Sequence, residues 1–217
     1  MLMLVTRRDG SRVAETKPRT RIQQRNRRAI LDAALDVFST EGFRGATLDQ
    51  IAKEAGLSKP NLLYYFASKE AIYTELLRIL LETWLKPLRE LDPGGDPIGE
   101  IVAYVRRKLQ MSRDYPRESR LFANEIVQGA PRIMGFIEND LRRVLDAEVA
   151  VVANWVDEGR IACRDPRHLI FSIWATTQHY ADFDAQVRAV VGGAGDRHFE
   201  DADAFLSDFY TRALQPD

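Results

Sequence analysis

The chain has 217 residues, of which 45% are hydrophobic and 29% charged, and its formal net charge is −1. This composition predicts a globular protein with room for one small and one larger domain. No apolar run approaches the roughly 20 residues that a membrane span needs, and the opening MLMLV is too short for a secretion signal, so we expect a cytoplasmic protein without membrane contact. The single cysteine, Cys163, excludes an internal disulfide and a thiolate zinc site.

The net charge hides an asymmetry along the chain. Residues 1–91 carry 16 Lys and Arg against 11 Asp and Glu, whereas residues 92–217 carry 15 against 21. The basic excess is concentrated between Arg7 and Arg28. We expect residues 1–21 to form a basic, disordered arm. Such an arm is either only solvated or, beside a DNA-binding element, adds phosphate or minor-groove contacts.

A first amphipathic helix is predicted over residues 22–40. Gly42 is expected to end it, and Gly45 to turn the chain toward the next element. Five apolar positions at helical spacing form its buried stripe: Ile30, Ala33, Ala34, Val37 and Phe38.

The segment TLDQIAKEAGLSKPNLLYYF, residues 47–66, predicts two short helices joined by a tight turn. Thr47 with Gln50 three residues later forms a capping box at the start of the first helix. Gly56 supplies the left-handed residue that stops this helix, and Ser58 caps the second. Two helices joined in this way are typical of a helix-turn-helix.

The second of these helices carries the chemistry of the motif. The first residues of a recognition helix enter the major groove, so Lys59, Pro60 and Asn61 are expected to face base edges. Tyr64 and Tyr65 follow one turn later, where a phenol can reach a phosphate while its ring packs. The alternative is an ordinary helical hairpin in which both tyrosines belong to the core.

A long connecting helix is predicted next, capped by Ser68 with Lys69 exposed in its first turn. Its apolar positions continue to Trp84, and Pro87 bends or ends it. The sequence DPGGDP over residues 92–97 is a clear break. We therefore assign residues 22–91 to the first domain with its connecting helix, and residues 98–217 to the second domain.

The stretch GFRGATLDQIAKEAGLSKPNLLYYFASKEAIY resembles the DNA-binding domain of the TetR family of transcriptional regulators. The resemblance implies an all-α protein with an N-terminal three-helix helix-turn-helix domain and a C-terminal helical domain for ligand binding and dimerisation. It implies a homodimer on double-stranded operator DNA, with Lys69 on a phosphate. The expected DNA-binding residues are Thr47, Ser58, Lys59, Pro60, Asn61, Tyr64, Tyr65 and Lys69.

The second domain shows helical spacing and no alternation of the kind that predicts strands. Five helices are expected, over residues 98–113, 117–128, 132–158, 166–190 and 199–214. The last two of each chain are expected to form a four-helix bundle in the dimer, since each reading domain covers only one half-site.

The helix over residues 166–190 carries the most unusual side chains. At 100° per residue, Phe171, Trp174, Gln178 and Asp182 share one narrow face, and His179 lies on its flank. One interpretation makes these residues core, interface or surface. The other makes them a pocket wall, with Trp174 as a stacking platform and an amide that can pair with adjacent C=O and N–H groups of a cyclic imide.

Within the TetR family, the segments SRDYP, SRLF and DPRHLIFSIWATTQHYADF resemble regulators of pyrimidine utilisation. This resemblance favours the pocket and implies a uracil- or thymine-like effector. Asn124, which is either a pocket residue or a satisfied structural one, lies where the sequence departs from that pattern, so the choice of pyrimidine stays open. The effector-binding candidates are Trp84, Asn124, Trp174, Gln178 and His179.

Enzyme function is not expected, because there is no phosphate-binding glycine loop after a strand and no nucleophile motif. The three histidines have no ligand spacing, so neither a metal nor a cofactor is predicted. The sequence therefore predicts a ligand-responsive DNA-binding regulator, and more specifically a repressor. The alternatives are a regulator that responds to a different small ligand and a constitutive DNA-binding factor with no ligand.

Overall fold

The computed structural model describes residues 21–192 and 195–216, and its regular elements over these residues are all helical. This confirms the predicted all-α class. The predicted basic arm lies outside the described residues, apart from Arg21. The elements are α1 (Arg21–Gly45), α2 (Leu48–Glu54), α3 (Lys59–Tyr65), α4 (Lys69–Leu85), α5 (Pro97–Asp114), α6 (Pro116–Val127), α7 (Met134–Phe136), a π-helical turn η1 (Ile137–Leu141), α8 (Arg142–Asp157), α9 (Pro166–Asp182), α10 (Asp184–Val191) and α11 (Arg197–Ala213).

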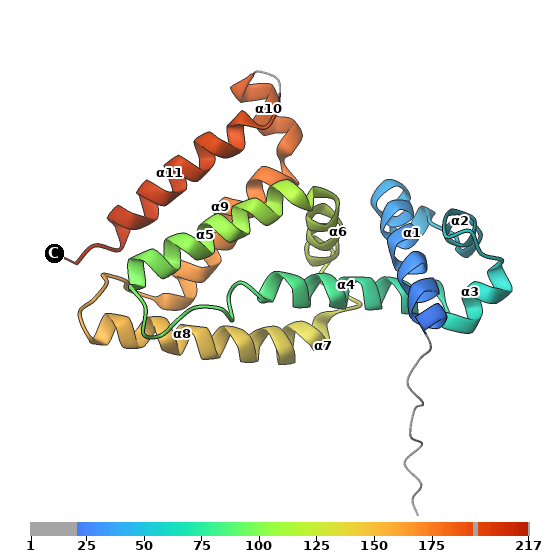
Figure 1. Cartoon of the computed structure of the whole chain (residues 1–217), viewed down its shortest axis with the longest axis horizontal. Coiled ribbons are helices and arrows are strands. Elements are labelled where there is room, and N and C mark those ends of the chain that lie inside the picture. Colours follow the sequence, from blue (N-terminus) through green and yellow to red (C-terminus); the bar gives the residue numbers. More distant parts are fainter. Residues whose placement is uncertain (1–20, 193–194, 217) are drawn as a thin grey trace, which may run out of the picture.

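Helices α1–α3 form a small unit at one end of the molecule (Figure 1). The predicted stripe of α1 is buried except at Val37, which is partly covered, and Leu35 is buried as well. Gly42 adopts φ 67° and ψ 173°, so the regular helix stops where the sequence predicted, and a short further turn follows it. The ring of Phe38 packs edge-on against Tyr73 of α4, with the centroids 4.8 Å apart. The start of α4 thus completes the core of this unit.

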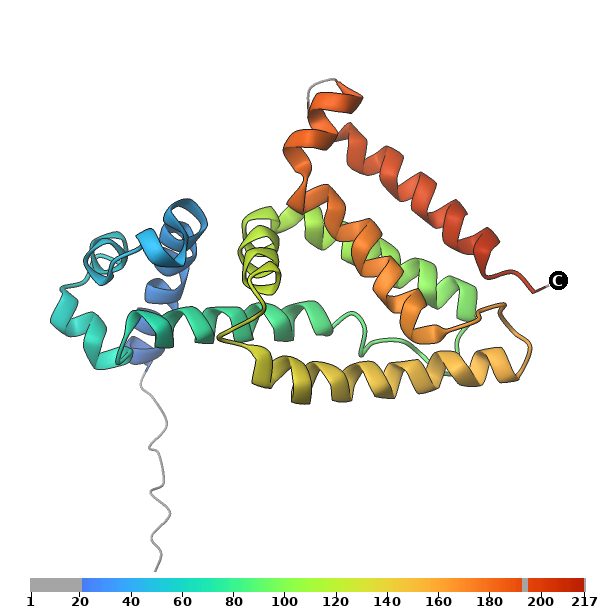
Figure 2. The same cartoon turned by 180° about the vertical axis from the view of Figure 1, so that it is seen from behind.

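Helix α4 runs from the N-terminal unit into the rest of the chain, as Figures 1 and 2 both show. It packs against α1 at its beginning and against α6 further along. Ile72 and Trp84, at opposite ends of the helix, are both buried. Because the helix ends at Leu85, just before Pro87, the predicted stop is confirmed.

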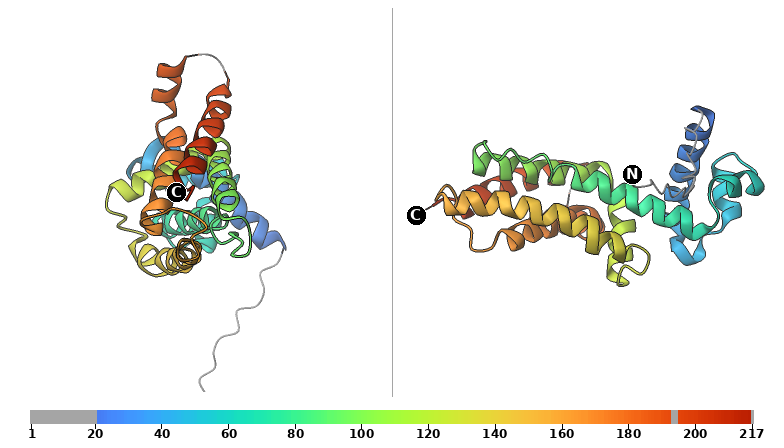
Figure 3. Two further views of the ribbon diagram at one scale, coloured as in Figure 1. Left: turned by 90° about the vertical axis from the view of Figure 1, so that its left-hand side faces the viewer. Right: turned by 90° about the horizontal axis from the view of Figure 1, so that it is seen from below.

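Helix α5 is the centre of the C-terminal part, with α9 packed on one side of it and α11 on another. The view from below shows α4 leading from the N-terminal unit to the C-terminal part, where α8 packs against α9 (Figure 3). Helix α6 stands across α4 and contacts α1 (Figure 1). It is therefore a second connection between the two parts, in addition to α4.

Two predicted helices are interrupted in the structure. The expected helix over residues 166–190 breaks at Phe183, which leaves the helical region with φ −115° and ψ 25°. The last turn of α9 is bound to α6 instead, because Arg120 donates to the carbonyl of Ala181 and Ser119 donates to Asp182. The expected helix over residues 132–158 begins only at Met134 and contains the π-helical turn, where one extra residue widens the helix.

None of the described helices is long and apolar enough to cross a bilayer.

Candidate DNA-binding surface and effector pocket

The turn between α2 and α3 has the local geometry that the sequence predicted. The Thr47 hydroxyl accepts from the backbone N–H of Gln50 at 3.2 Å, and the Gln50 carboxamide oxygen accepts from the backbone N–H of Thr47 at 2.8 Å. Gly56 has φ 67°, and the Ser58 hydroxyl accepts from the N–H of Asn61 at 3.3 Å. Both helices therefore begin at capped residues, which fixes where the side chains of α3 point.

The leading end of α3 is open to solvent. Ser58, Lys59, Pro60 and Asn61 are all exposed. Lys59 Nζ donates to the Asp49 carboxylate of α2 at 2.9 Å, and both side chains are largely solvated. Without DNA, Lys59, the first residue of α3, is therefore paired with Asp49.

The two tyrosines of α3 have different environments. Tyr64 is 69% exposed, so the alternative in which it is a core residue of an ordinary helical hairpin does not hold. Its hydroxyl accepts a hydrogen bond from Gln23 at 3.2 Å, whereas the Tyr65 hydroxyl accepts from Asn26 at 3.0 Å. Both partners lie on α1, so α1 supports the tyrosine end of the recognition helix.

Lys69 is not the exposed first-turn residue that the sequence predicted. Its ammonium donates to the backbone carbonyls of Phe43 and Ala46, both at 2.7 Å, and lies 4.6 Å from the centroid of the Phe43 ring. These carbonyls lie where the chain leaves α1 and have no partner in a regular helix. The structure therefore gives Lys69 a role in fixing α1 to α4, and one N–H remains for another acceptor.

A cavity of about 360 Å³ lies between α4, α5, α6, the π-helical turn and α9. Trp84, Trp174 and Gln178 all line it, so three of the five predicted effector residues lie together. Trp84 packs edge-on against Phe122, with the ring centroids 5.0 Å apart. Trp174 Nε1 donates to the Tyr104 hydroxyl at 2.7 Å, which fixes the orientation of the indole. Most of the remaining wall is apolar: Leu81, Leu85, Ala123, Ile126, Val127, Ile137 and Leu141.

One polar group in this wall was missed by the sequence analysis. Lys108 of α5 is 4% exposed and lines the cavity, with Nζ 5.7 Å from the centroid of the Trp84 ring. Burial lowers the pKa of Lys108 to about 8, although the negative charge of Asp182 acts in the opposite direction. The signal was present in the sequence, because Lys108 stands at helical spacing from the buried Ile101 and Tyr104.

Asn124 and His179 do not line this cavity. Asn124 is exposed and is not held among its apolar neighbours on α6. The reason is helical spacing, since the apolar neighbours Phe122 and Ile126 turn toward the cavity and Asn124 turns away. His179 is also exposed, and its ring stacks on Phe183 with the centroids 5.1 Å apart.

A second, larger cavity of about 720 Å³ lies between the end of α1 and α6, and Asn124 borders it. Its wall includes a pair of charged residues, Glu125 and Arg132, that bind each other. Glu125, which is 1% exposed, accepts from the backbone N–H of Arg132 at 2.8 Å and from its guanidinium at 3.0 Å. The Arg132 guanidinium in turn covers the ring of Phe43. Because Glu125 and Arg132 already pair with each other, we take the smaller aromatic cavity as the better ligand site.

Comparison with known proteins decides the family. Residues 77–217 match the family described as "YcdC-like protein, C-terminal region", and residues 30–76 match "Bacterial regulatory proteins, tetR family". The chain belongs to the TetR family. The two matched regions meet inside α4, the helix that both parts of this TetR-family protein share.

Among curated proteins, the chain is similar to the HTH-type transcriptional regulator RutR of Escherichia coli strain K12. The two are 51% identical over 180 residues, which is 83% of this chain and 85% of RutR. The predicted family and the resemblance to RutR are thus confirmed, and this TetR-family protein is a DNA-binding transcriptional regulator.

Solved structures show the same fold. A transcriptional regulator from Streptomyces coelicolor aligns with a TM-score of 0.71 at 22% identity, over 88% of this chain and 99% of that one. The ketosteroid transcriptional regulator KstR2 of Mycobacterium tuberculosis aligns with a TM-score of 0.66 at 20% identity, over 88% and 95%. At these identities the likeness concerns the fold alone.

Proposed function

We propose that this TetR-family regulator represses genes of pyrimidine utilisation and leaves its operator when a uracil- or thymine-like base binds. The observation that carries the proposal is that Trp84, Trp174 and Gln178, from helices far apart in the sequence, line one aromatic cavity. The resemblance to RutR, which extends over 83% of this chain, supports the ligand class.

The cavity suits a flat, polar heterocycle. Trp84 and Trp174 offer aromatic faces and edges for a planar ring, and Gln178 offers one donor and one acceptor on the same amide. A pyrimidine imide has adjacent C=O and N–H groups that such an amide meets with two hydrogen bonds. A constitutive DNA-binding protein needs no cavity of this composition, so the cavity favours the ligand-responsive alternative.

On the DNA side, the exposed end of α3 is proposed to enter the major groove. Lys59 and Asn61 read base edges there, with Pro60 beside them, while Thr47, Ser58, Tyr64, Tyr65 and Lys69 bind the backbone. Lys59 exchanges its bond to Asp49 for DNA when the complex forms. The basic segment before α1 adds contacts that depend on charge alone.

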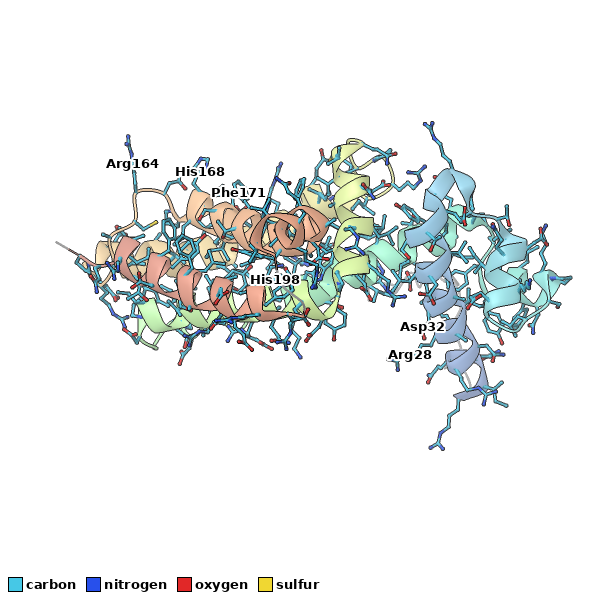
Figure 4. All side chains as sticks on the ribbon, turned by 90° about the horizontal axis from the view of Figure 1, so that it is seen from above. Arg28, Asp32, Arg164, His168, Phe171 and His198 are labelled. Atoms are coloured by element: carbon cyan, nitrogen blue, oxygen red, sulfur yellow. The ribbon has the colours of Figure 1, made fainter. Side chains whose placement is uncertain are left out.

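The active form is proposed to be a homodimer. Each chain has one DNA-reading unit, helices α1–α3, and two such reading units must meet successive half-sites. Helices α9–α11 leave several large apolar side chains exposed, and Figure 4 shows Phe171 at the outer side of α9. The others are Phe183, Val190, Val191, Phe205 and Phe209. The rings of Phe205 and Phe209 stack one turn apart on α11, as a continuous apolar strip would require.

Two helices connect the cavity to the reading unit. Helix α4 carries Trp84 at the cavity and Lys69 at the reading unit, and these 15 residues span about 22 Å. Helix α6 lines the cavity with Phe122 and contacts α1. A ligand that favours one position of these helices changes the spacing of the two reading units in the dimer. By linkage, the ligand weakens DNA binding by the same factor as DNA weakens ligand binding.

Isothermal titration calorimetry with uracil and thymine tests the ligand class. The expected result is saturable binding to the unmodified protein and its loss in Gln178→Leu, which keeps similar bulk but has no amide. Thr83→Val, an exposed change on α4, is the matched control and should bind as the unmodified protein does. If neither base binds the unmodified protein, the pyrimidine assignment fails and only the TetR-family regulator stands.

A further inference from the structure

Lys108 is a buried cation in a cavity whose other lining residues, apart from Gln178, are aromatic and aliphatic. Over the described residues, its ammonium has no hydrogen bond and no ion pair, and its nearest recorded contact is the face of Trp84. Taking a charged amine out of water costs several kcal/mol unless a partner offsets it. The cation–π contact, with Nζ 5.7 Å from the centroid of the Trp84 ring, offsets only part of this cost.

The acidic group that acts on Lys108 does not satisfy it. Asp182 of α9 favours the charged form of Lys108 through space, but the two side chains form no ion pair within the described residues. The Asp182 carboxylate instead accepts from the Ser119 hydroxyl at 2.6 Å, and Arg120 provides it with positive charge. The ammonium therefore keeps its three N–H donors for something that enters the cavity.

We propose that Lys108 is the anchor of the effector site, where its ammonium donates to an oxygen of the ligand. The site then takes planar ring compounds that carry a carbonyl or carboxylate oxygen at the edge facing α5. The side-chain amide of Gln178 on α9 forms hydrogen bonds with another edge of the same ring. This inference rests on the proposed function in so far as it places the effector in the aromatic cavity.

The Lys108 ammonium selects ligands that present a hydrogen-bond acceptor to it. An ammonium has only donors, so an amino group at the same edge of the ligand would face it with hydrogens and leave both groups unpaired. Leaving a buried donor unpaired destabilises a complex, and more so when the donor is charged. The oxo edge of uracil satisfies Lys108, whereas a ring with only an amino substituent cannot. The competing view is that the Lys108 stem packs on Trp84 and its head reaches water through the cavity mouth.

Binding by the full-length protein separates these views. Uracil, benzoate and aniline are titrated against the unmodified protein, Lys108→Met and Lys86→Met. Met keeps the length and packing of the stem without donors. Lys86, which is 76% exposed just after α4, loses the same charge at a site away from the cavity. We expect Lys108→Met to bind uracil about 10- to 100-fold more weakly, as for loss of a charge-assisted hydrogen bond, and Lys86→Met to bind it normally.

The other outcomes are equally informative. If uracil binds Lys108→Met as tightly as the unmodified protein, the anchor is overturned while the proposed function stands. If uracil fails to bind but benzoate binds in a way that depends on Lys108, the pyrimidine proposal fails and the anchor stands. If neither oxygen-bearing probe binds, the anchor is also overturned. Should Lys108→Met not fold, the unmodified protein decides: benzoate but not aniline must bind, and equal binding of the two contradicts the anchor.

Discussion

The guanidinium carbon of Arg132 lies 3.7 Å from the centroid of the Phe43 ring. This contact joins the loop after α6 to the end of α1, so it bridges the two parts of the molecule. Glu125, in the last turn of α6, holds Arg132 in place. Because Phe122 and Ile126 of the same helix line the aromatic cavity, α6 carries the cavity on one face and the bridge to the reading unit on another.

Replacing Glu125 should therefore weaken the protein and the link between its parts. Glu125→Ala leaves the Arg132 guanidinium largely buried without its carboxylate, which is expected to cost about 3 kcal/mol of unfolding free energy. Urea denaturation measures this cost. Glu90→Ala, which removes an exposed carboxylate 3.9 Å from Lys86, is the control and should change stability by less than about 0.5 kcal/mol. Equal effects of the two substitutions would show that Glu125 does not support the bridge.

Lys69→Ala should lower both stability and DNA affinity. The substitution removes two charge-assisted hydrogen bonds to the carbonyls of Phe43 and Ala46, with an expected loss of about 2–3 kcal/mol in unfolding free energy. Specific and random DNA should be bound more weakly to a similar degree, because a phosphate contact carries no sequence information. Urea denaturation and fluorescence anisotropy give the two readouts. A change of preference at one base pair, with random DNA unaffected, would assign Lys69 a different role.

The leading residues of α3 should behave differently from Lys69. Lys59→Ala and Asn61→Ala are each expected to cost about 1–3 kcal/mol of operator binding and to relax preference at one position of the half-site. Their effect on stability should be small, since both side chains are exposed. Competition binding against single-base operator variants measures the preference. Uniform weakening across all variants would place these side chains on the backbone instead.

The pKa of Lys108 predicts an unusual gain of stability on substitution. Burial holds this pKa near 8, against 10.5 in a solvated lysine. The charge on Lys108 therefore destabilises the folded protein at neutral pH. The difference corresponds to about 3 kcal/mol. Lys108→Met should therefore be more stable than the unmodified protein at pH 7, by up to about this amount.

The stability of the unmodified protein should increase as the pH rises above 8. As pH rises through 8, the folded protein loses the Lys108 proton while the unfolded chain keeps it up to about 10.5, so the unmodified protein gains stability over this window. The advantage of Lys108→Met should shrink accordingly between pH 7 and pH 9.5. Thermal unfolding of the ligand-free proteins at both values checks this. An advantage that stays constant with pH would mean that Lys108 is not charged and buried as described.

Local chemistry explains which features the sequence predicted well. The caps at Thr47 and Ser58 and the left-handed Gly56 act within a few residues, so they are readable without knowing the fold. The spacing of Trp174 and Gln178 on one helix likewise placed both on the same face.

Contacts between distant elements explain the rest. Neither the break at Phe183 nor the π-helical turn involves a glycine or proline at the interruption, so the sequence carried no local signal for them. The environment of Lys69 depends on carbonyls more than 20 residues away. Asn124, by contrast, could have been placed from spacing alone, because at 100° per residue it lies about 200° from Phe122 and from Ile126, which line the cavity.

The central claim is that a pyrimidine base in the aromatic cavity releases this regulator from DNA. The direct test is a uracil titration of the complex between the full-length protein and an operator selected from random DNA by the ligand-free protein, followed by fluorescence anisotropy. Uracil should lower the operator affinity of the unmodified protein about 5- to 150-fold, the usual range of allosteric coupling. Gln178→Leu should bind the operator normally and not respond. If uracil leaves the unmodified complex intact at concentrations that saturate the cavity, the account of the switch is contradicted.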